Sequence, residues 1–439
     1  MCSGLWSASF FVYVCGNLRT MRNFICRLAG SAIRTASVSL ALAMPLSCSN
    51  LDGDGHRRSS YARGERYEHD TSVSGPSSDE KKDTSIYAIG VEYPSGYDWR
   101  LDPDYGNAEC RLVVFNGQKR MLVADAGPDR KISPDADRNR VVGGHLYSDY
   151  SDGSSTWVHR DGELLFKYDI PETILGFAVS GGDVHTLGEN RSGEGLSLRR
   201  NGQEVFSSST GHVLGSSFSE PLYEDEGELC FAYCTGTGDA RKYYQFSGNT
   251  DEKVDIPDQM LSLLAMRRIG GELYMAGPTV SSRGCPVFFY NGKTFPASSA
   301  VTTKSSHNCR FIVSGGSVYL SGDLVFNDNS KGHCLWRSNG ETVHSSANVY
   351  EYYMSDGIAA YPETDPKGFV QTIVAGGERY TVGDSLKILS PLCASYSGGK
   401  FYAVMTPSAK ERSPVLWKNG RLLAYTLNGY MAGVYVDIH

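Results

Sequence analysis

The sequence predicts an all-β protein: an eight-bladed β-propeller of four-stranded antiparallel blades, with seven blades as the alternative count. Three observations carry the prediction: the composition, a four-strand unit repeated every 40 to 50 residues or so, and complementary chain ends. Glycine and tyrosine contribute 49 and 27 of the 439 residues, and only 21% of residues are charged. This composition suits short strands joined by tight turns.

The repeated unit has a recognisable order of strands and turns. A first strand ends in a glycine pair, a second carries Leu-Tyr or a variant, and a polar loop leads to a third strand. An Asn-Gly type of turn then precedes a short fourth strand, because both central residues of a type I′ hairpin turn need positive φ. These third-to-fourth turns begin at Asn116, Asp161, Asn201, Ser247, Asn291, Asn339, Gly376 and Asn419. The weak unit around Gly376 leaves the seven-bladed alternative open.

The two ends of the repeat region complement each other. The first unit opens at its second strand, Ser85–Gly90, and lacks a first strand. After the last turn, Tyr430–Val436 reads as a first strand without a blade of its own. We therefore expect the C-terminal strand to complete the first blade and close the ring, which leaves no open sheet edge.

Residues 1–48 are predicted to be a signal peptide. Arg22 and Arg27 form a basic start, and the apolar run Ala36–Leu46 ends just before Cys48. The run is too short to span a membrane, which takes about 20 residues. A cysteine at the cleavage position resembles the lipobox of bacterial lipoproteins, although Pro45 departs from it, and the resemblance implies lipidation of Cys48.

The chain is thus expected to have three parts. The basic residues after Met21 make that methionine a better start than Met1 for the signal peptide at 1–48. Residues 49–84 are polar and mixed in charge, as in a disordered tether. Residues 85–439 form the propeller, and a monomer is expected.

The repeat also resembles known proteins. The Gly-Gly-x-Leu-Tyr segment, as in Gly270–Tyr274, resembles kelch repeats, whereas the Asn-Gly turn and a late tryptophan depart from them. The whole body is similar to bacterial propeller lipoproteins of unknown function. This resemblance implies an outer-membrane lipoprotein facing the periplasm or the cell surface, and it implies no activity.

The most distinctive candidate site is the long loop of the first blade, Pro94–Glu109. The tight turns share one face of the ring and the longer, variable loops share the other, where binding is usual. Aromatic rings beside carboxylates suit a glycan or peptide ligand, and self-packing of the loop is the alternative. The predicted ligand-binding residues are Tyr97, Trp99, Asp102, Asp104 and Tyr105.

Catalysis and cofactors are not predicted. No Ser-His-Asp order with a nucleophile elbow is visible, and no histidine or cysteine spacing marks a metal site. Calcium is the one candidate cofactor, since Asp102, Asp104 and Glu109 loosely resemble an acidic calcium loop. A net charge of −7 and a pI near 5.8 argue against nucleic acid as a partner.

The expected function is non-enzymatic binding of a glycan, a peptide or another envelope protein, with membrane contact through the lipid anchor only. Two alternatives stay open: an enzyme that acts on carbohydrate, whether a glycoside hydrolase or a lyase, and a structural spacer. Convergent carboxylates in a deep pocket would favour the enzyme. Trp157, Trp336 and Trp417 recur on third strands, which predicts packing between blades.

Overall fold

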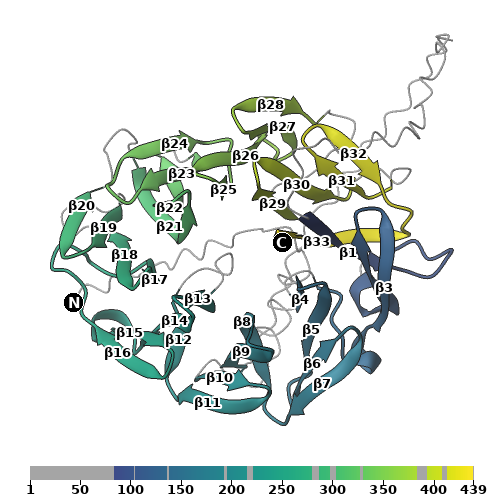
Figure 1. Cartoon of the computed structure of the whole chain (residues 1–439), viewed down its shortest axis with the longest axis horizontal. Helices are drawn as coiled ribbons and strands as arrows, with labels where there is room; N and C mark the ends of the chain where they lie inside the picture. The colour runs from purple at the N-terminus through teal and green to yellow at the C-terminus, as the bar shows by residue number, and fades with distance from the viewer. Residues whose placement is uncertain are drawn as a thin grey trace, which may run out of the picture. The chain divides into compact units, whose positions relative to one another are not determined.

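The computed structural model describes residues 84–438, with gaps at 103, 136–137, 192–194, 215–220, 279–285, 297–302, 327–329, 383–392 and 408–412. The predicted signal peptide, Cys48 and nearly all of the predicted tether lie outside the described residues. Residues from Thr84 onward form one compact unit, an all-β ring of eight antiparallel blades (Figure 1). The predicted eight-bladed propeller is therefore confirmed, and the seven-bladed alternative is wrong.

The first four blades run from the centre of the ring outward as follows (Figure 1). Blade 1 contains β33 (Gly429–Ile438), β1 (Thr84–Glu92), β2 (Cys110–Asn116) and β3 (Lys119–Ala126). Blade 2 contains β4 (Asn139–Val142), β5 (His145–Ser151), β6 (Thr156–Arg160) and β7 (Glu163–Tyr168). Blade 3 contains β8 (Glu172–Ser180), β9 (Asp183–Asn190), β10 (Leu196–Arg200) and β11 (Gln203–Ser208). In blade 4, β12 (Gly211–Val213) and β13 (Tyr223–Asp225) both pair with β14 (Glu228–Thr235), and β15 (Lys242–Ser247) and β16 (Thr250–Val254) follow outward.

The other four blades follow the same order. Blade 5 contains β17 (Ala265–Ile269), β18 (Glu272–Pro278), β19 (Pro286–Tyr290) and β20 (Lys293–Pro296). Blade 6 contains β21 (Thr303–Ser314), β22 (Ser317–Phe326), β23 (Lys331–Arg337) and β24 (Thr342–Ser346). Blade 7 contains β25 (Tyr353–Ser355), β26 (Ile358–Thr364), β27 (Val370–Ala375) and β28 (Glu378–Thr381). Blade 8 contains β29 (Cys393–Ser397), β30 (Lys400–Met405), β31 (Val415–Lys418) and β32 (Arg421–Ala424).

Helical structure is confined to single 3-10 turns in the part of the chain that the structure describes. They are η1 (Tyr105–Asn107), η2 (Pro128–Arg130) and η4 (Gly238–Ala240). No helix among the described residues is both long and apolar enough to cross a membrane.

The tight turns have the geometry that their sequences predict. Every turn between first and second strands has two residues with positive φ, such as Gly270 (57°) and Gly271 (78°). Asn201 (49°) and Gly202 (82°) do the same between third and fourth strands. These are the angle signs of a type I′ turn, which follows the twist of the paired strands.

Three turns differ in detail from the prediction. Asn116 and Ser247 are the last residues of β2 and β15, so the turns begin one residue later, at Gly117 and Gly248. Only the first residue of each of these two turns has positive φ, the type II′ pattern that also favours glycine there. The β23–β24 turn has four residues, 338–341, rather than two.

The first turn residue also binds the neighbouring strand. The side-chain oxygens of Asp161, Asn201 and Asn419 each accept a hydrogen bond from a backbone N–H near the start of the second strand of their blade. The donor–acceptor distances are 2.9, 2.9 and 2.8 Å. Aspartate and asparagine therefore have two roles at this position. They tolerate the left-handed backbone, and their side-chain oxygen accepts a hydrogen bond from the second strand.

Apolar clusters join the blades. Seven clusters of buried residues in the described part each combine side chains of two consecutive blades. Trp336 and Trp417 are 2% and 1% exposed and lie at the junctions of blades 5–6 and 7–8, as predicted. Trp157 is only half-buried, with Lys131 Nζ 4.8 Å from its ring centroid, so the prediction is wrong for this tryptophan.

The junction of blades 2 and 3 contains a buried ion pair. Glu172 and Arg199 are 3% and 5% exposed, and their Oε1 and Nη2 atoms lie 2.9 Å apart. The Arg199 guanidinium also stacks 4.4 Å from the ring centroid of Tyr168 in blade 2. A charge buried this deeply needs such partners, because removing one leaves the other unpaired at a high cost.

The C-terminal strand closes the ring as predicted. β33 pairs antiparallel with β1 along its whole length, for example Tyr87 opposite Tyr435. The Tyr435 hydroxyl donates a hydrogen bond to the Asn139 carbonyl at 2.5 Å, which ties β33 to β4 in blade 2. Blade 1 is therefore assembled from both ends of the propeller.

Asn201 gives a test of the turn chemistry. Asn201→Ala should lower the free energy of unfolding by about 1–3 kcal/mol, because alanine is disfavoured at positive φ and the Val184 N–H loses its acceptor. Asn201→Gly, the matched control, keeps the backbone freedom and should cost less. Urea-induced unfolding of the full chain measures both variants. If both variants lowered the free energy of unfolding equally, the positive φ at residue 201 would make no contribution to stability.

Candidate functional site

The two faces of the ring differ as predicted. All but one of the turns on one face, the turn face, have two residues. The other face, the loop face, carries the second-to-third-strand loops and the connections between blades, and residues 93–109 in blade 1 form its longest described loop. Long loops on one side of a rigid ring are the usual place for binding, so this is the face on which a binding site is expected.

The first part of the blade-one loop (residues 93–109) is held by Asn428. The Asn428 side-chain amide donates to the carbonyls of Pro94 at 2.8 Å and Tyr97 at 3.2 Å. The Tyr93 N–H donates to the Asn428 carbonyl at 2.8 Å. The loop is thus fixed by the segment that leads into β33.

The predicted aromatic residues form one cluster. Trp99 packs with Tyr105, Tyr97 packs with Tyr93, and all three predicted residues lie against the core of blades 1 and 2. Tyr93 and Tyr430 join them, with ring centroids of Trp99 and Tyr430 5.4 Å apart and those of Trp99 and Tyr105 5.7 Å apart. Most of this aromatic surface therefore stabilises the loop itself.

The predicted carboxylates differ in their surroundings. The Tyr97 hydroxyl donates to Asp102 Oδ2 at 2.5 Å, and the Asp104 N–H donates to Asp102 Oδ1 at 2.8 Å. The hydrogen bond from Tyr97 holds the pKa of Asp102 below its usual value. Partial burial and the same bond raise the pKa of Tyr97 to about 12, so the donor stays protonated at neutral pH. Asp104 is exposed.

The structure thus brings all five predicted ligand-binding residues into one loop, but it does not test whether they bind a ligand. Sequence analysis missed one residue there: Leu101 is 70% exposed at the outside of the loop. A leucine beside charged residues gives no sequence pattern that separates an exposed from a buried side chain. Arg100 lies with its guanidinium 4.5 Å from the Trp99 ring centroid.

Calcium binding in this loop stays a prediction. Both oxygens of Asp102 accept hydrogen bonds from the loop. Across the described ranges, no group of three or more His, Cys, Asp or Glu side chains is arranged to hold a metal ion. The Asp102 carboxylate therefore serves to fold the loop.

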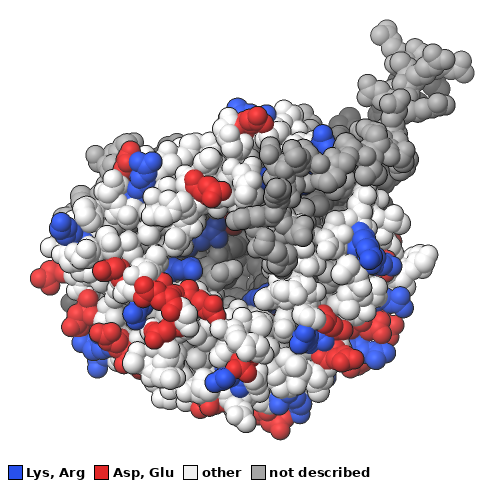
Figure 2. All heavy atoms as spheres, viewed as in Figure 1, with Lys and Arg blue, Asp and Glu red and all other residues white. Residues whose placement is uncertain are grey.

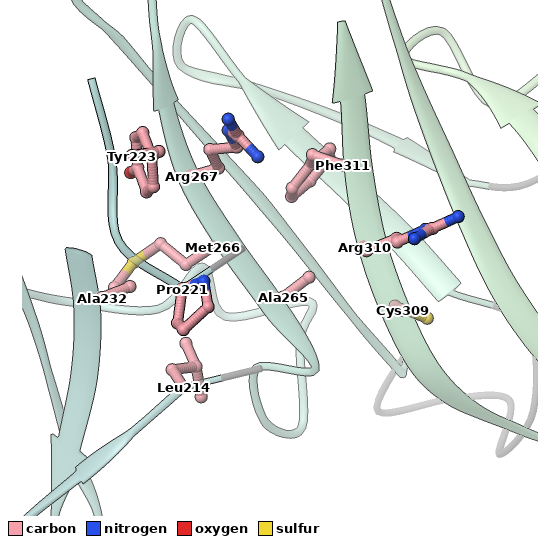
Figure 3. A pocket seen from close by; sticks show the side chains of 10 residues that line it. All are labelled: Leu214, Pro221, Tyr223, Ala232, Ala265, Met266, Arg267, Cys309, Arg310 and Phe311. Atoms are coloured by element: carbon pink, nitrogen blue, oxygen red, sulfur yellow. The ribbon is translucent and has the colours of Figure 1, made fainter. Parts of the chain in front are cut away.

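A second candidate site lies on the inner wall of the ring. Figure 2 shows Lys and Arg side chains close to the centre of the ring, and the inner strands supply Arg140, Arg267, Arg268 and Arg310. A small pocket opens among the inner strands of blades 4, 5 and 6 (Figure 3). Its lining residues are Leu214, Pro221, Tyr223, Ala232, Ala265, Met266, Arg267, Cys309, Arg310 and Phe311.

One wall of this pocket is a fixed tyrosine. Tyr223 is 7% exposed, and its hydroxyl accepts a hydrogen bond from the Arg268 N–H at 2.8 Å. Burial raises the pKa of Tyr223 to about 12. The Arg267 guanidinium stacks on the Tyr223 ring at 4.3 Å from its centroid. Sequence analysis missed this site because its residues come from three blades and share no motif.

Blade 6 holds a third arrangement that the sequence did not reveal. Ser321 Oγ and His333 Nε2 lie 2.7 Å apart, and His333 Nδ1 lies 2.6 Å from Asp323 Oδ1. Ser321 and Asp323 are two residues apart on β22 and face the same side, and Asp323 is the register partner of His333 on β23. This is the hydrogen-bond order of a Ser-His-Asp triad.

The Ser321–His333–Asp323 hydrogen-bond series differs from a catalytic triad because its serine is buried. Ser321 is 0% exposed and His333 is 6% exposed, so a substrate carbonyl has no access to the serine oxygen. The Tyr352 hydroxyl, in a residue that is also 0% exposed, donates to the His333 carbonyl at 3.3 Å at the junction with blade 7. The role of these hydrogen bonds is to satisfy the polar side-chain atoms of Ser321 and His333 in the interior of blade 6.

Comparison with known proteins found distantly similar solved structures and no matching family. No protein-family profile matches the sequence, and no curated protein is significantly similar to it. Among solved structures, dihydro-heme d1 dehydrogenase NirN is 10% identical, with a TM-score of 0.42 over 80% of this chain and 74% of that one. TolB from Acinetobacter baumannii is 10% identical, with a TM-score of 0.33 over 80% and 82%. An uncharacterized protein from Listeria monocytogenes is 10% identical, with a TM-score of 0.34 over 68% and 83%.

The structural role of Ser321 can be measured. Ser321→Ala removes the partner of a buried ring nitrogen and should lower the free energy of unfolding by about 1–3 kcal/mol. Ser317→Ala, at an exposed serine on the same strand, should change it by less than about 0.5 kcal/mol. Labelling of Ser321 by a fluorophosphonate in the folded protein would show instead that the serine is an accessible nucleophile.

Proposed function

We propose that this protein is a lipid-anchored component of the bacterial cell envelope whose propeller binds a glycan, a peptide or another envelope protein without catalysis. The observation that carries the proposal is the blade-one loop, which is long, clamped by Asn428 and displayed on the loop face. A loop that is already ordered loses little conformational entropy when a ligand binds, and this favours affinity.

The outer surface of the loop supplies the contacts. Leu101, 70% exposed, offers an apolar surface, and the exposed Asp104 carboxylate offers hydrogen-bond acceptors. The packed Tyr97, Trp99 and Tyr105 order the loop that carries these two residues, and their own rings remain half-exposed. An apolar group beside an acceptor suits a sugar ring or a peptide side chain.

The charges near the two candidate sites favour binding over hydrolysis. Glycoside hydrolysis needs two carboxyl groups facing one bond. In the blade-one loop Asp102 is committed to hydrogen bonds with Tyr97 and Asp104, and the described lining of the inner-wall pocket carries arginines without a carboxylate. This distribution fits recognition of a ligand better than acid–base chemistry.

The anchor can be tested through Cys48. The full-length coding sequence expressed in a bacterium should give a protein that incorporates radiolabelled palmitate and partitions into detergent. Cys48→Ser should lose both properties, because the thiol is the proposed acceptor of the lipid. Cys26→Ser, which changes a cysteine within the proposed signal peptide, is the matched control and should keep them. Unchanged labelling of Cys48→Ser would rule out this anchor.

Ligand binding by the loop can be tested on glycan and peptide arrays with the full chain, with and without calcium. Leu101→Asp and Asp104→Asn should each reduce the bound signal by about tenfold, the effect of one lost contact of about 1.4 kcal/mol. Leu165→Asp, at an exposed leucine on β7, is the control and should bind normally. No selective binding to either array would favour the structural spacer.

A further inference from the structure

The inner-wall pocket carries an inference that is independent of the blade-one loop. Ala265, Met266 and Arg267 form the first three residues of β17, on the side of the strand that leads in from the loop face. Phe311 on β21 and Tyr223 on β13 face this strand from the neighbouring blades (Figure 3). Most of the described lining therefore comes from strands of three blades, and Leu214 and Pro221 come from the connection between β12 and β13.

Arg267 differs from the arginines beside it. Arg268 lies 3.7 Å from the Asp225 carboxylate, and Arg310 lies 3.3 Å from the Glu351 carboxylate. Within the described part of the chain Arg267 forms no ion pair, and its guanidinium stacks on the Tyr223 ring instead. The close-up view shows this guanidinium between Tyr223 and Phe311 (Figure 3).

The stacked geometry leaves the edge of the guanidinium available. A cation over an aromatic face is attracted by the ring quadrupole, so Tyr223 holds Arg267 in place without using its N–H donors. The Tyr223 ring is itself fixed by its hydrogen bond from the Arg268 N–H. A planar fork of donors held in this way matches both oxygens of a carboxylate.

We propose that this pocket binds a small carboxylate that carries an apolar group, with the carboxylate on Arg267 and the apolar group against Leu214, Met266 and Phe311. The lining as described includes no acidic side chain that would repel an anion. The apolar side chains supply the burial that an aliphatic group needs. The C-terminal residue of a peptide and a short free fatty acid share this chemistry.

The test is calorimetric titration of the full-length protein with three probes. N-acetyl-leucine carries the carboxylate and an aliphatic side chain, N-acetyl-leucinamide lacks the charge, and hexanoate lacks the peptide group. We expect N-acetyl-leucine to bind at least about tenfold more tightly than the amide. Binding of hexanoate as well would extend the site to alkyl carboxylates in general, whereas its absence would assign the site to peptide C-termini.

Two substitutions locate the binding. Arg267→Gln should weaken the affinity for N-acetyl-leucine at least about tenfold, and Arg267→Lys should weaken it less, since lysine keeps the charge but loses the fork. Arg140→Gln, on the inner strand of blade 2 and 3.8 Å from Asp149, controls for general charge near the ring centre and should bind normally. Thermal unfolding confirms that each variant is folded.

Three outcomes would overturn the proposal: no binding of N-acetyl-leucine, equal binding of the amide, or equal losses for Arg267→Gln and Arg140→Gln. The site shares no residue with the blade-one loop. A negative titration would therefore not contradict the proposal for the blade-one loop. An absence of binding on the arrays would likewise not contradict the proposal for this pocket.

Discussion

The pairing of β33 with β1 is the constraint on which the whole ring depends. Without it, β1 would present an unpaired row of N–H and C=O groups, and blade 1 would lack its innermost strand. The same C-terminal segment also supplies Asn428 and Tyr430, which fix the blade-one loop on the loop face. The segment that closes the ring therefore also orders the candidate site.

The ring is held at its other junctions by two kinds of contact. Apolar clusters, with Trp336 and Trp417 among their largest side chains, depend on shape and volume. The Glu172–Arg199 pair at the junction of blades 2 and 3 depends on matched charges and hydrogen bonds. Apolar packing tolerates exchange of similar residues, whereas the buried pair tolerates little, because a lone charge there stays unsolvated.

The repeat was predictable from sequence because its chemistry is local. Asn201-Gly202 adopts positive φ whatever surrounds it, and a series of such turns fixes strand order and blade number. The roles of Trp99 and Tyr105 could not be predicted from sequence, because the same aromatic residues can face a ligand or pack against one another. Arg267 and Tyr223 were also invisible, since their stacking joins two blades that sequence alone does not align.

Closure by β33 also sets an order of events in time. Most strand pairs join neighbours in sequence, which form quickly, but Tyr87 can meet Tyr435 only when nearly the whole chain is present. A chain that emerges from its N-terminus must keep the inner edge of β1 unpaired until Gly429–Ile438 has been synthesised. Folding of this propeller therefore waits for β33, and a product that lacks β33 is left with an open strand edge that can pair with other chains.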